Sequence, residues 1–511
     1  MKRAAEELLF KNMYRAIIDE GKRPFCGWML EHAVTAYPDR TAIIYDDVHI
    51  SYKTLYVDAC YISHYLRENG VSEGDRVLLY IENSPFFLAA YYGAWQIGAV
   101  VAPLNFFLHP KELDHICKDA EPHCIITMAE KIPLFDDIRR NCTSRIYTEQ
   151  DVFGDKTKPV PSITVPARDH DALAILLYTS GTTGMPKGVM LSSKNIATNM
   201  AQSLARFGLT SQERTFCVLP LFHAFSQITC VWMSIFMGAT IILVPKVERR
   251  LIMQGLAHRP TVFLGVPPLY GLLCMIRHIA FDEVKFFVSG ADALPDKIRA
   301  IFGLVYRRKI CNGYGLTECG PVVSMDVEDE LLCAGNAGDF LCGITYSLRD
   351  HEGKEVPPGH IGQLFVKGDN VMMGYYNAPE QNAAVLQNGF LDTGDLAYVD
   401  EKGRLVIAGR EKDVIKHKGI NIYPQEVENI ILLHPDVIRV GVIGKEDELT
   451  GQIPVAFVQL RTTVKDIENI LKELCQRHLA VYKIPKNFVC GTQELPTTVT
   501  GKVDKKRLKS V

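Results

Sequence analysis

The sequence predicts an α/β protein: a large amino-terminal domain of layered α/β subdomains plus a β-rich subdomain, followed by a small α+β domain. Three observations support this fold class. Apolar, often β-branched runs alternate with helix-like segments along the first part of the chain. Glycine and short strand-like runs become dense after about residue 335, and a compact unit with its own strand and helix patterns follows residue 409. Runs that are apolar on both faces are typical of strands covered by helices on both sides.

Apolar runs predict the strands of the large domain. They cover residues 76–81, 99–104, 124–126 and 240–244. Turn residues follow each run and lead into a helical pattern, such as the one over residues 85–97. Parallel strands need a crossover connection, usually a helix, so this alternation indicates parallel sheets buried between helices.

The residue pattern of the sequence then changes twice, after about residue 335 and after residue 409. Short runs bounded by glycine, at residues 362–368 and 403–409, indicate a β-rich subdomain over about residues 335–409. Beyond it the expected helices and strands cover residues 424–433, 437–444, 453–460 and 464–479. We therefore predict a large domain over residues 1–409 and a small mobile domain over residues 410–511, with a hinge near Lys412.

Composition and charge exclude several classes of protein. The 511 residues are 47% hydrophobic and 23% charged, as in globular proteins, and the net charge of −3 gives no argument for a nucleic-acid partner. The 14 cysteines are scattered singly, which is typical of reduced thiols. No apolar stretch reaches the roughly 18 residues of a transmembrane segment. We expect a cytoplasmic protein, and peripheral membrane contact by the amphipathic amino terminus stays an alternative.

The most informative stretch is LYTSGTTGMPKGVML, from Leu177 to Leu191, directly behind an apolar run. Small residues, hydroxyls and one cation behind a buried strand suit a polyphosphate, because glycine allows close backbone approach and the hydroxyls and the ammonium donate hydrogen bonds. The stretch is not a Walker A loop, and a flexible surface turn is the alternative. The candidate phosphate-binding residues are Thr179, Ser180, Gly181, Thr182, Thr183, Gly184 and Lys187.

Two further blocks place carboxylates beside glycines. In Asn-Gly-Tyr-Gly-Leu-Thr-Glu, the ring of Tyr314 can stack on a purine, and Glu318 can hold Mg²⁺ against phosphate oxygens. In Leu-Asp-Thr-Gly-Asp, Asp395 can accept hydrogen bonds from both hydroxyls of a ribose. A glycine-rich turn with an exposed glutamate and an Asx turn are the alternatives.

Cations gather around turns near the predicted hinge and near the end of the chain. Arg410, Lys412 and Lys416 stand in GREKDVIKHKGINIYP, where glycine and proline interrupt any long charged helix. Lys502 follows a glycine in PTTVTGK, a loop with few other charges. Solvent exposure is the alternative for each of them.

Together, these blocks make the chain resemble the adenylate-forming superfamily of acyl-CoA synthetases, firefly-type luciferases and peptide-synthetase adenylation domains. The resemblance runs from about Thr41 to Lys502 and rests on blocks that stand in that superfamily's order. They are YTSGTTGMPKG, PLFHAFS, NGYGLTE, GQLFVKGDNVMMGYYN, FLDTGD, GREKDVIKHKGINIYP and PTTVTGK.

The resemblance implies a two-step reaction. A carboxylate attacks the α-phosphate of MgATP and pyrophosphate leaves. The small domain then turns, and the thiol of CoA attacks the acyl-adenylate. The expected cofactors are therefore ATP, Mg²⁺ and CoA, and we expect the thiol to come from a separate molecule.

For the phosphates, the resemblance implies that the stretch from Thr179 to Lys187 wraps the β- and γ-phosphates. Thr179 and Glu318 would hold Mg²⁺, and Thr317 would contact the α-phosphate.

For the nucleoside, the resemblance implies that Tyr314 stacks on adenine, with Gly290 and Gly313 nearby. Asp395 and Arg410 would hold the ribose.

For the acyl group, the resemblance places His223 at the mouth of the acyl tunnel. Lys502 would bridge the substrate carboxylate and the α-phosphate during adenylation only. Lys412 occupies the hinge position, and Lys416 would face the nucleotide during thioester formation. The catalytic set implied in this way is Lys502, Lys416, His223, Glu318 and Thr317.

The acid itself is less well specified. His223 stands where amino-acid-activating relatives carry Asp, and the neighbouring residues 265–270 are apolar, so we expect a medium- or long-chain fatty acid. An aryl acid, transfer to the phosphopantetheine of a carrier protein and a catalytically dead adenylate-binding protein are the alternatives. Asp292 departs from the family's small residues, and it would either face solvent or bind a polar tail of the substrate.

Overall fold

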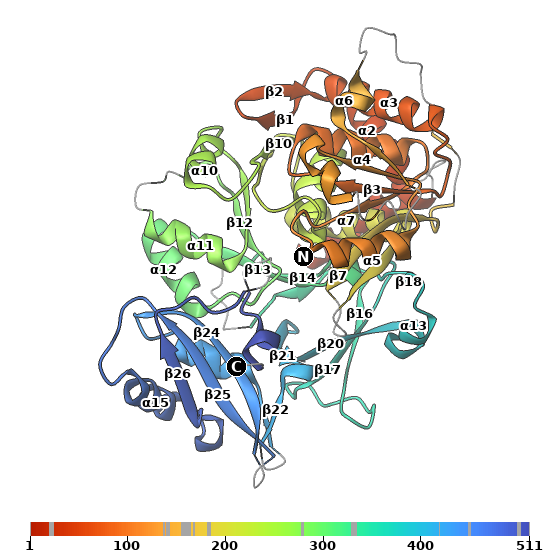
Figure 1. Ribbon diagram of the computed structural model, residues 1–511. Coiled ribbons are helices and arrows are strands. Elements are labelled where there is room, and N and C mark those ends of the chain that lie inside the picture. The colour runs from red at the N-terminus through yellow and green to blue at the C-terminus, as the bar shows by residue number, and fades with distance from the viewer. Residues whose placement is uncertain are drawn as a thin grey trace.

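The computed structural model describes residues 2–19, 25–135, 138, 144–154, 165–166, 169–180, 185–276, 279, 281–328, 335–417, 420–447, 451–497 and 502–509. Helices and sheets alternate in layers through the upper part of the molecule, and a smaller unit lies below them (Figure 1). The predicted α/β fold class is confirmed. Among the described residues we find no helix with the length and hydropathy of a membrane span.

The largest sheet has nine strands and is parallel in its centre. Antiparallel strands complete both edges. In spatial order the strands are β15 (Asp339–Phe340), β14 (Val322–Met325), β13 (Ile310–Gly315), β12 (Phe286–Ser289), β11 (Val262–Gly265), β9 (Arg214–Cys217), β10 (Thr240–Leu243), β1 (Thr41–Tyr45) and β2 (Val48–Ser51).

A second sheet of seven strands repeats this plan, with a parallel centre and an antiparallel edge. Its strands, in spatial order, are β18 (Gly374–Tyr375), β8 (Pro186–Ser192), β7 (Leu173–Ser180), β4 (Val100–Pro103), β3 (Arg76–Tyr80), β5 (Cys124–Thr127) and β6 (Arg145–Tyr147). The expected strands at residues 76–81, 99–104, 124–126 and 240–244 thus all lie in these two sheets.

Helices cover both faces of both sheets. Between the sheets lies one large core, built from alternate strand residues of each sheet and from α2 (Phe25–Ala36), α3 (Tyr52–Glu68), α4 (Pro85–Gln96), α7 (Ser193–Phe207), η4 (Gln227–Trp232) and α9 (Met233–Met237). The outer face of the nine-stranded sheet packs on α10 (Arg249–Leu256), α11 (Pro267–Met275) and α12 (Asp296–Tyr306). The outer face of the other sheet packs on α5 (Pro110–Ala120) and η2 (Ala129–Phe135). Burial on both faces explains why these strands read as unbroken apolar runs.

A third sheet, which is antiparallel, is formed by strands within residues 345–410, after the strands of the nine-stranded sheet. It contains β16 (Thr345–Arg349), β17 (Gly362–Lys367), β20 (Phe390–Val399), β19 (Leu386–Gln387) and β21 (Leu405–Arg410), and α13 (Pro379–Val385) lies beside it. The smaller helical segments of the chain are η1 (Arg15–Asp19), α6 (Glu149–Phe153), α8 (Ala224–Ser226), η5 (Thr317–Cys319), η6 (Glu411–Asp413) and η7 (Val481–Lys483).

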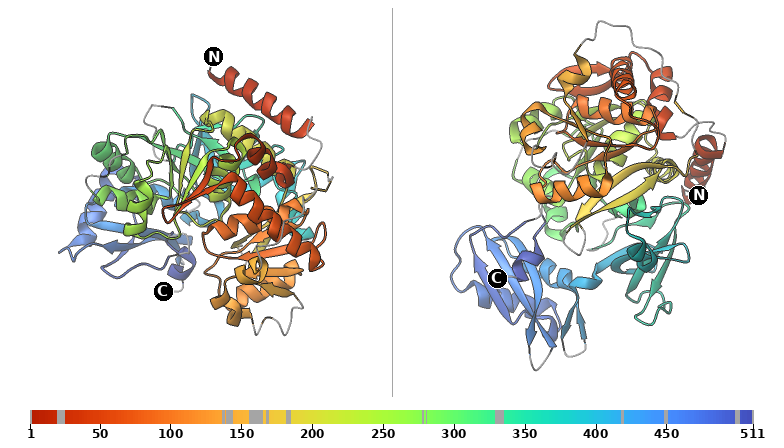
Figure 2. Two further views of the ribbon diagram at one scale, coloured as in Figure 1. Left: turned by 90° about the horizontal axis from the view of Figure 1, so that it is seen from above. Right: turned by 45° about the vertical axis from the view of Figure 1, so that its right-hand side comes forward.

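The last part of the chain forms the small unit, which has its own sheet and its own core. Its elements are β22 (Ile415–His417), β23 (Ile420–Ile422), α14 (Pro424–Ile431), β24 (Val437–Asp447), β25 (Gly451–Leu460), α15 (Ile467–His478), β26 (Asn487–Gly491) and α16 (Lys505–Lys509). Figure 2 shows this unit beside the third sheet and below the layered part. The exact domain boundary at residues 409/410 and the hinge near Lys412 stay predictions.

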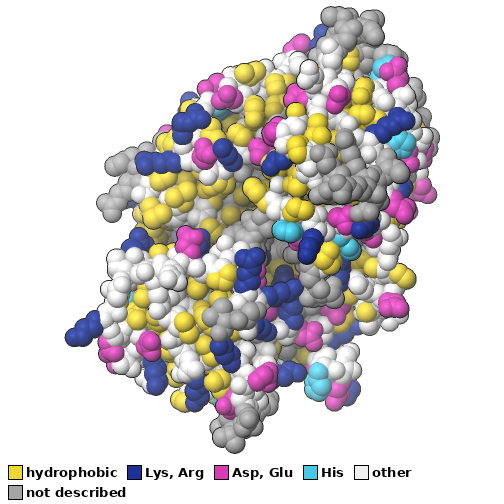
Figure 3. Space-filling model, in the orientation of Figure 1, with side chains coloured by type: hydrophobic (Ala, Val, Ile, Leu, Met, Phe, Trp, Pro, Cys, Tyr) yellow, Lys and Arg dark blue, Asp and Glu magenta, His cyan; other side chains and the backbone are white. Residues whose placement is uncertain are grey.

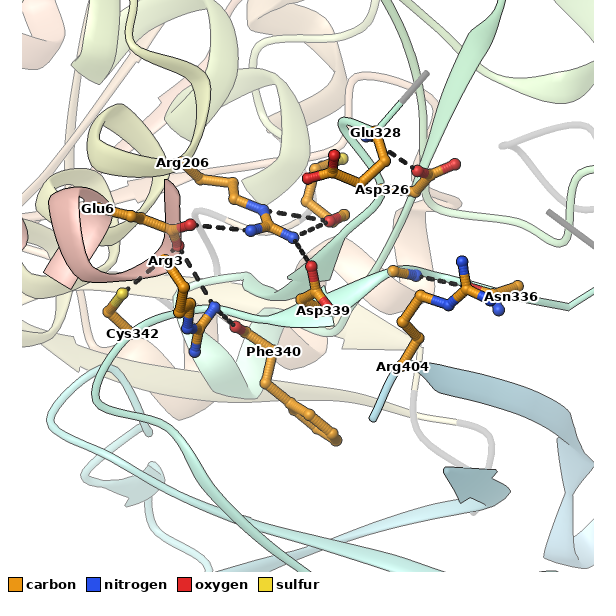
Figure 4. A network of polar contacts seen from close by, with 12 residues as sticks. Arg3, Glu6, Arg206, Asp326, Glu328, Asn336, Asp339, Phe340, Cys342 and Arg404 are labelled. Atoms are coloured by element: carbon orange, nitrogen blue, oxygen red, sulfur yellow. Dashed lines mark hydrogen bonds and ion pairs between the residues drawn. The ribbon is translucent and has the colours of Figure 1, made fainter. Parts of the chain in front are cut away.

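The first helix, α1 (Lys2–Tyr14), is tied to the layers by a buried ionic cluster (Figure 4). Arg206, near the end of α7, donates from Nη1 to Glu6 Oε2 at 2.8 Å and from Nη2 to Asp339 Oδ2 at 2.5 Å. Its Nη2 also donates to the carbonyl of Met325 at 3.0 Å. Burial would lower the pKa of Arg206, but the two carboxylates outweigh it and raise the pKa. The cluster therefore links the beginning of the chain to strands that follow it by more than three hundred residues.

Removing the cation of this cluster should destabilise the fold strongly. Arg206→Met leaves buried Glu6 with only the longer contact to Arg3, at 3.5 Å, and breaking a buried pair costs about 3–5 kcal/mol. The free energy of unfolding in urea measures the loss. Lys118→Met is the matched control, because Lys118 pairs with Asp114 at 2.6 Å on an accessible helix face, where such a pair contributes about 0–1 kcal/mol. Equal losses in the two variants would contradict the assigned role of the cluster.

Candidate functional site

Three of the predicted site residues, His223, Gly290 and Tyr314, lie at one edge of the nine-stranded sheet. Parallel strands end there together, so the segments that follow β9, β12 and β13 meet at the same edge, where α/β proteins usually bind ligands. His223 follows β9, Gly290 follows β12, and Tyr314 lies near the end of β13. Figure 3 shows lysine and arginine side chains around the recess between the layered part and the small unit.

One group in the site joins an aromatic, a carboxylate and a guanidinium. The hydroxyl of Tyr314 donates to Asp395 Oδ2 at 2.6 Å, and Arg410 Nε lies 3.3 Å from Asp395 Oδ1. Asp395 and Arg410 face each other directly across the antiparallel ladder of β20 and β21. The ladder register therefore brings together two residues that the sequence placed in separate blocks.

The charge state of Asp395 follows from this environment. Burial raises its pKa, and Arg410, the Tyr314 hydroxyl, Lys502 and Lys412 oppose that rise. Burial and the carboxylate together raise the pKa of Tyr314 well above its ordinary value, so the phenol stays protonated and donates. Asp395 is thus a buried carboxylate whose orientation is fixed by its neighbours. Such a carboxylate can accept hydrogen bonds from the hydroxyls of a ligand.

A second group lies where the β7–β8 hairpin meets η5. Thr179 and Lys187 are directly paired in the hairpin. Tyr375, on the adjacent strand β18, donates its hydroxyl to Glu318 Oε1 at 2.8 Å, and Lys187 Nζ lies 5.5 Å from the centroid of the same ring. Tyr375 connects the hairpin to Glu318, and residue-by-residue reading of the sequence did not single it out. Its position inside the GYYN end of a family block was the available signal.

The buried strand expected before the phosphate-binding residues is β7, which runs to Ser180, and the antiparallel strand β8 begins at Pro186. Their pairing satisfies the backbone groups on both sides of the turn. The predicted residues Gly181, Thr182, Thr183 and Gly184 lie outside the described residues, as does the side chain of Ser180.

The donor set near the hairpin suits a magnesium ion that arrives with phosphates. Among the described residues there is no group of three His, Cys, Asp or Glu side chains that could hold a metal by itself. Glu318 offers one carboxylate and Thr179 one hydroxyl. Mg²⁺ commonly takes one or two carboxylates and completes its shell with water and substrate phosphates, so these residues fit it.

Two glycines of the site allow close packing. A Cβ at Gly290 would lie 3.0 Å from the ring of Phe225, and one at Gly313 would lie 2.4 Å from the Met325 side chain. Thr317 and Glu318 form η5 directly after this region and are half-buried. The predicted neighbours of the adenine ring are therefore sterically constrained positions.

A third group contains His223, Lys502 and Asp292. The backbone N–H of Phe225 donates to His223 Nδ1 at 3.2 Å, so the neutral ring carries its proton on Nε2. Burial, and secondarily the charge of Lys502, lower the pKa of His223 to about 4. Lys502 Nζ lies 3.6 Å from Asp292 Oδ1, and about a third of the Asp292 side chain is exposed. The role expected for Asp292 in binding a polar tail of the substrate stays a prediction.

The remaining predicted cations are divided between two places. Lys412 lies in η6, next to Arg410, and its charge acts on Asp395. Lys416 is exposed in the middle of β22, and its backbone N–H donates to Gln452 Oε1 at 3.1 Å. Lys502 contacts Asp292, in the segment that follows β12. Lys416 stays with the strands of the small unit, because it lies in β22 (Figure 1).

Comparisons with known proteins match nearly the whole chain. Residues 30–376 match the model of a family described as AMP-binding enzyme, and residues 426–502 match that of the AMP-binding enzyme C-terminal domain. A long-chain-fatty-acid–CoA ligase of Bacillus subtilis (strain 168) is 32% identical, over 94% of this chain and 93% of its own. A feruloyl-CoA synthase of an Amycolatopsis species is also 32% identical, over 91% of this chain and 94% of its own. The structure of ATP-bound MatB from Rhodopseudomonas palustris superposes with a TM-score of 0.88 at 28% identity, covering 94% of this chain and 98% of that one.

The neighbourhood of His223 and Lys502 can be tested through the imidazole. Lys502→Met removes a nearby positive charge, which favours the protonated ring, so the pKa of His223 should rise above about 4. It should stay below 6.5, because burial is the larger cause. Titration of ¹⁵N-labelled histidine by NMR measures it, with the His223 signal assigned by its loss in His223→Gln. Lys505→Met is the control, since Lys505 pairs with Glu428 within the small unit. An unchanged pKa in Lys502→Met would place the two residues apart.

Proposed function

The chain belongs to the family of AMP-binding enzymes and is an acyl-CoA synthetase, and from that premise we propose that it activates a medium- or long-chain fatty acid. In the first step a carboxylate oxygen of the acid attacks the α-phosphorus of ATP, and the bond to pyrophosphate breaks. In the second step the sulfur of CoA attacks the acyl carbon, AMP leaves, and the thiol proton is released. A free carboxylate is a poor acyl donor, and the mixed anhydride with AMP makes transfer feasible.

The position of Lys502 is the observation that carries this proposal. Lys502 Nζ lies 3.6 Å from Asp292 Oδ1, and its charge lowers the pKa of His223 and opposes the rise of the pKa of Asp395, so the ammonium is near both the proposed acyl mouth and the proposed ribose site. Negative charge concentrates at that point when a carboxylate approaches a phosphate. A fixed cation there reduces the repulsion and stabilises the transition state.

The nucleotide is assigned to the two other groups of the site. Asp395 and Arg410 would hold the ribose, and Tyr314, fixed by its hydrogen bond to Asp395, would stack on adenine. The backbone and side chains from Thr179 to Lys187 would receive the β- and γ-phosphates, and Thr317 would contact the α-phosphate. Glu318 and Thr179 would hold Mg²⁺, which offsets phosphate charge when bound.

Thioester formation requires the other face of the small domain. Lys416 is exposed in β22 of the small domain, whereas Lys502 contacts Asp292 of the large domain, so a rotation about the hinge near Lys412 would exchange one lysine for the other. Such domain rotations are an established way for one site to serve two steps.

An acid without an α-amino group suits the acyl end of the site. The imidazole of His223 is held neutral by burial, and a neutral group cannot pair with an α-ammonium as a carboxylate would. Gly265, at the end of β11, leads into the apolar start of α11, where a Cβ at Gly265 would meet Tyr270 at 3.0 Å. An apolar wall favours a fatty acid, and the similarity to a feruloyl-CoA synthase favours an aryl acid as the second candidate.

Pyrophosphate release with a panel of carboxylic acids tests the proposed substrate class. We expect saturated fatty acids of medium and long chain to give the highest kcat/KM, with thioester formed only when CoA is present. A preference for cinnamic or benzoic acids would replace the fatty acid with an aryl acid. Pyrophosphate release without use of CoA, but with transfer to a phosphopantetheine carrier protein, would change the acceptor. No release with any acid would identify a protein that binds nucleotide without catalysis.

The two lysines should separate the two steps. Lys502→Ala should abolish ATP–pyrophosphate exchange and still convert pre-made acyl-AMP and CoA into thioester, because the ammonium is needed only while the carboxylate attacks phosphorus. Lys416→Ala and Lys412→Pro should leave ATP–pyrophosphate exchange intact and lower the rate of thioester formation. Both rates are measured separately for each variant, and equal loss of both rates in Lys502→Ala would contradict the assignment.

A further inference from the structure

We propose that Asp292 and Lys297 act as positioning residues that hold the small domain in the orientation that delivers Lys502 to the site. Both lie in the segment that follows β12, and each contacts the small domain. The inference rests on the proposed function, since it assigns these two residues to the first of the two steps.

Lys297 supplies a cation of the large domain to backbone oxygens of the small domain. It lies in the first turn of α12, and its Nζ donates to the carbonyl of His434 at 2.7 Å and lies 3.5 Å from the carbonyl of Pro435. These carbonyls follow α14 in the small domain. The ammonium is partly buried there, and loss of hydration, followed by repulsion from Arg461, lowers its pKa. A charged donor shared between two carbonyls is a strong and directional contact.

In the second contact the cation comes from the small domain: Lys502 of the small domain faces Asp292 of the large domain. Its Oδ1 accepts the backbone N–H of Ala293 at 2.9 Å, which orients the carboxylate. The same oxygen lies 3.6 Å from Lys502 Nζ, and about a third of each side chain is exposed. Before an acid substrate binds, Asp292 therefore supplies the negative charge that keeps Lys502 at the sheet edge.

Both contacts belong to one orientation of the small domain. His434 and Lys502 both lie in the small domain, whereas Asp292 and Lys297 are five residues apart in the large one. A rotation that brings Lys416 to the site must move His434 and Lys502 together, so it breaks both contacts at once. A contact made in only one of two states shifts the population toward that state by the strength of the contact.

The half-reactions of the full-length protein test this role. Lys297→Met keeps the aliphatic stem and removes the donors, so ATP–pyrophosphate exchange should fall by about tenfold, within the usual range of coupling between sites. The conversion of pre-made acyl-AMP and CoA into thioester should not fall. Asp292→Asn should likewise lower ATP–pyrophosphate exchange relative to thioester formation from pre-made acyl-AMP. Lys297→Arg should restore most of the exchange rate, because a guanidinium can also donate to two carbonyls.

Lys354→Met is the matched control. Lys354 is an exposed lysine of the β-rich subdomain that pairs with its neighbour Glu352 at 2.7 Å, and its replacement should leave both rates unchanged. Equal loss of both half-reactions in Lys297→Met, with no rescue in Lys297→Arg, would overturn the proposal, since that pattern indicates general damage to the fold. Unchanged half-reactions in both Lys297→Met and Asp292→Asn would overturn it as well.

A measurement that needs no activity separates this inference from the proposed function. In Lys297→Met, hydrogen–deuterium exchange should accelerate in peptides that cover residues 289–300 and 430–440, and it should not in Lys354→Met. If the parent protein releases no pyrophosphate with any acid, but this exchange still accelerates, the proposed function fails and the domain contact stands. If the parent is active and exchange is unchanged, the positioning role fails.

Discussion

The site depends on one cation that does not belong to the layers it serves. Lys502 comes from the small domain, whereas the sheet edge that it reaches is built by β9, β12 and β13 of the large domain. Its charge acts on His223, which follows β9 and caps α8, and on Asp395, which lies in β20 of the third sheet. The first step, in the form proposed above, therefore requires the small domain to be docked, and the contacts across that interface support the proposed position of Lys502.

The third sheet connects this interface to the nucleotide side. Its strand β20 supplies Asp395, and the opposite strand β21 ends at Arg410, directly before η6 and the first strand of the small domain. One antiparallel ladder thus fixes the proposed ribose-binding pair and leads into the proposed hinge. Because register in such a ladder is specified residue by residue, a slip would separate the carboxylate from the guanidinium.

Much of the layered fold could be predicted from periodicity, because strands buried on both faces read as continuous apolar runs. The family blocks also led to Asp395, Arg410, Tyr314 and Lys502, which the structure brings to one edge. Pairings across elements could not be predicted in this way. The link from Tyr375 to Glu318 depends on the pairing of β18 with β8, and the partner of Asp292 depends on how a separate domain docks. The local spacing of residues in the sequence predicts neither of these two contacts.

The buried cluster around Arg206 has a consequence for biosynthesis. Glu6 is made first, its cation two hundred residues later, and the second carboxylate, Asp339, only after most of the layered core has been synthesised. Domains generally fold as units while the chain emerges from the ribosome. The first helix therefore reaches its complete set of contacts late, and a nascent chain released before Asp339 would leave the Arg206 guanidinium without one of its two carboxylate partners.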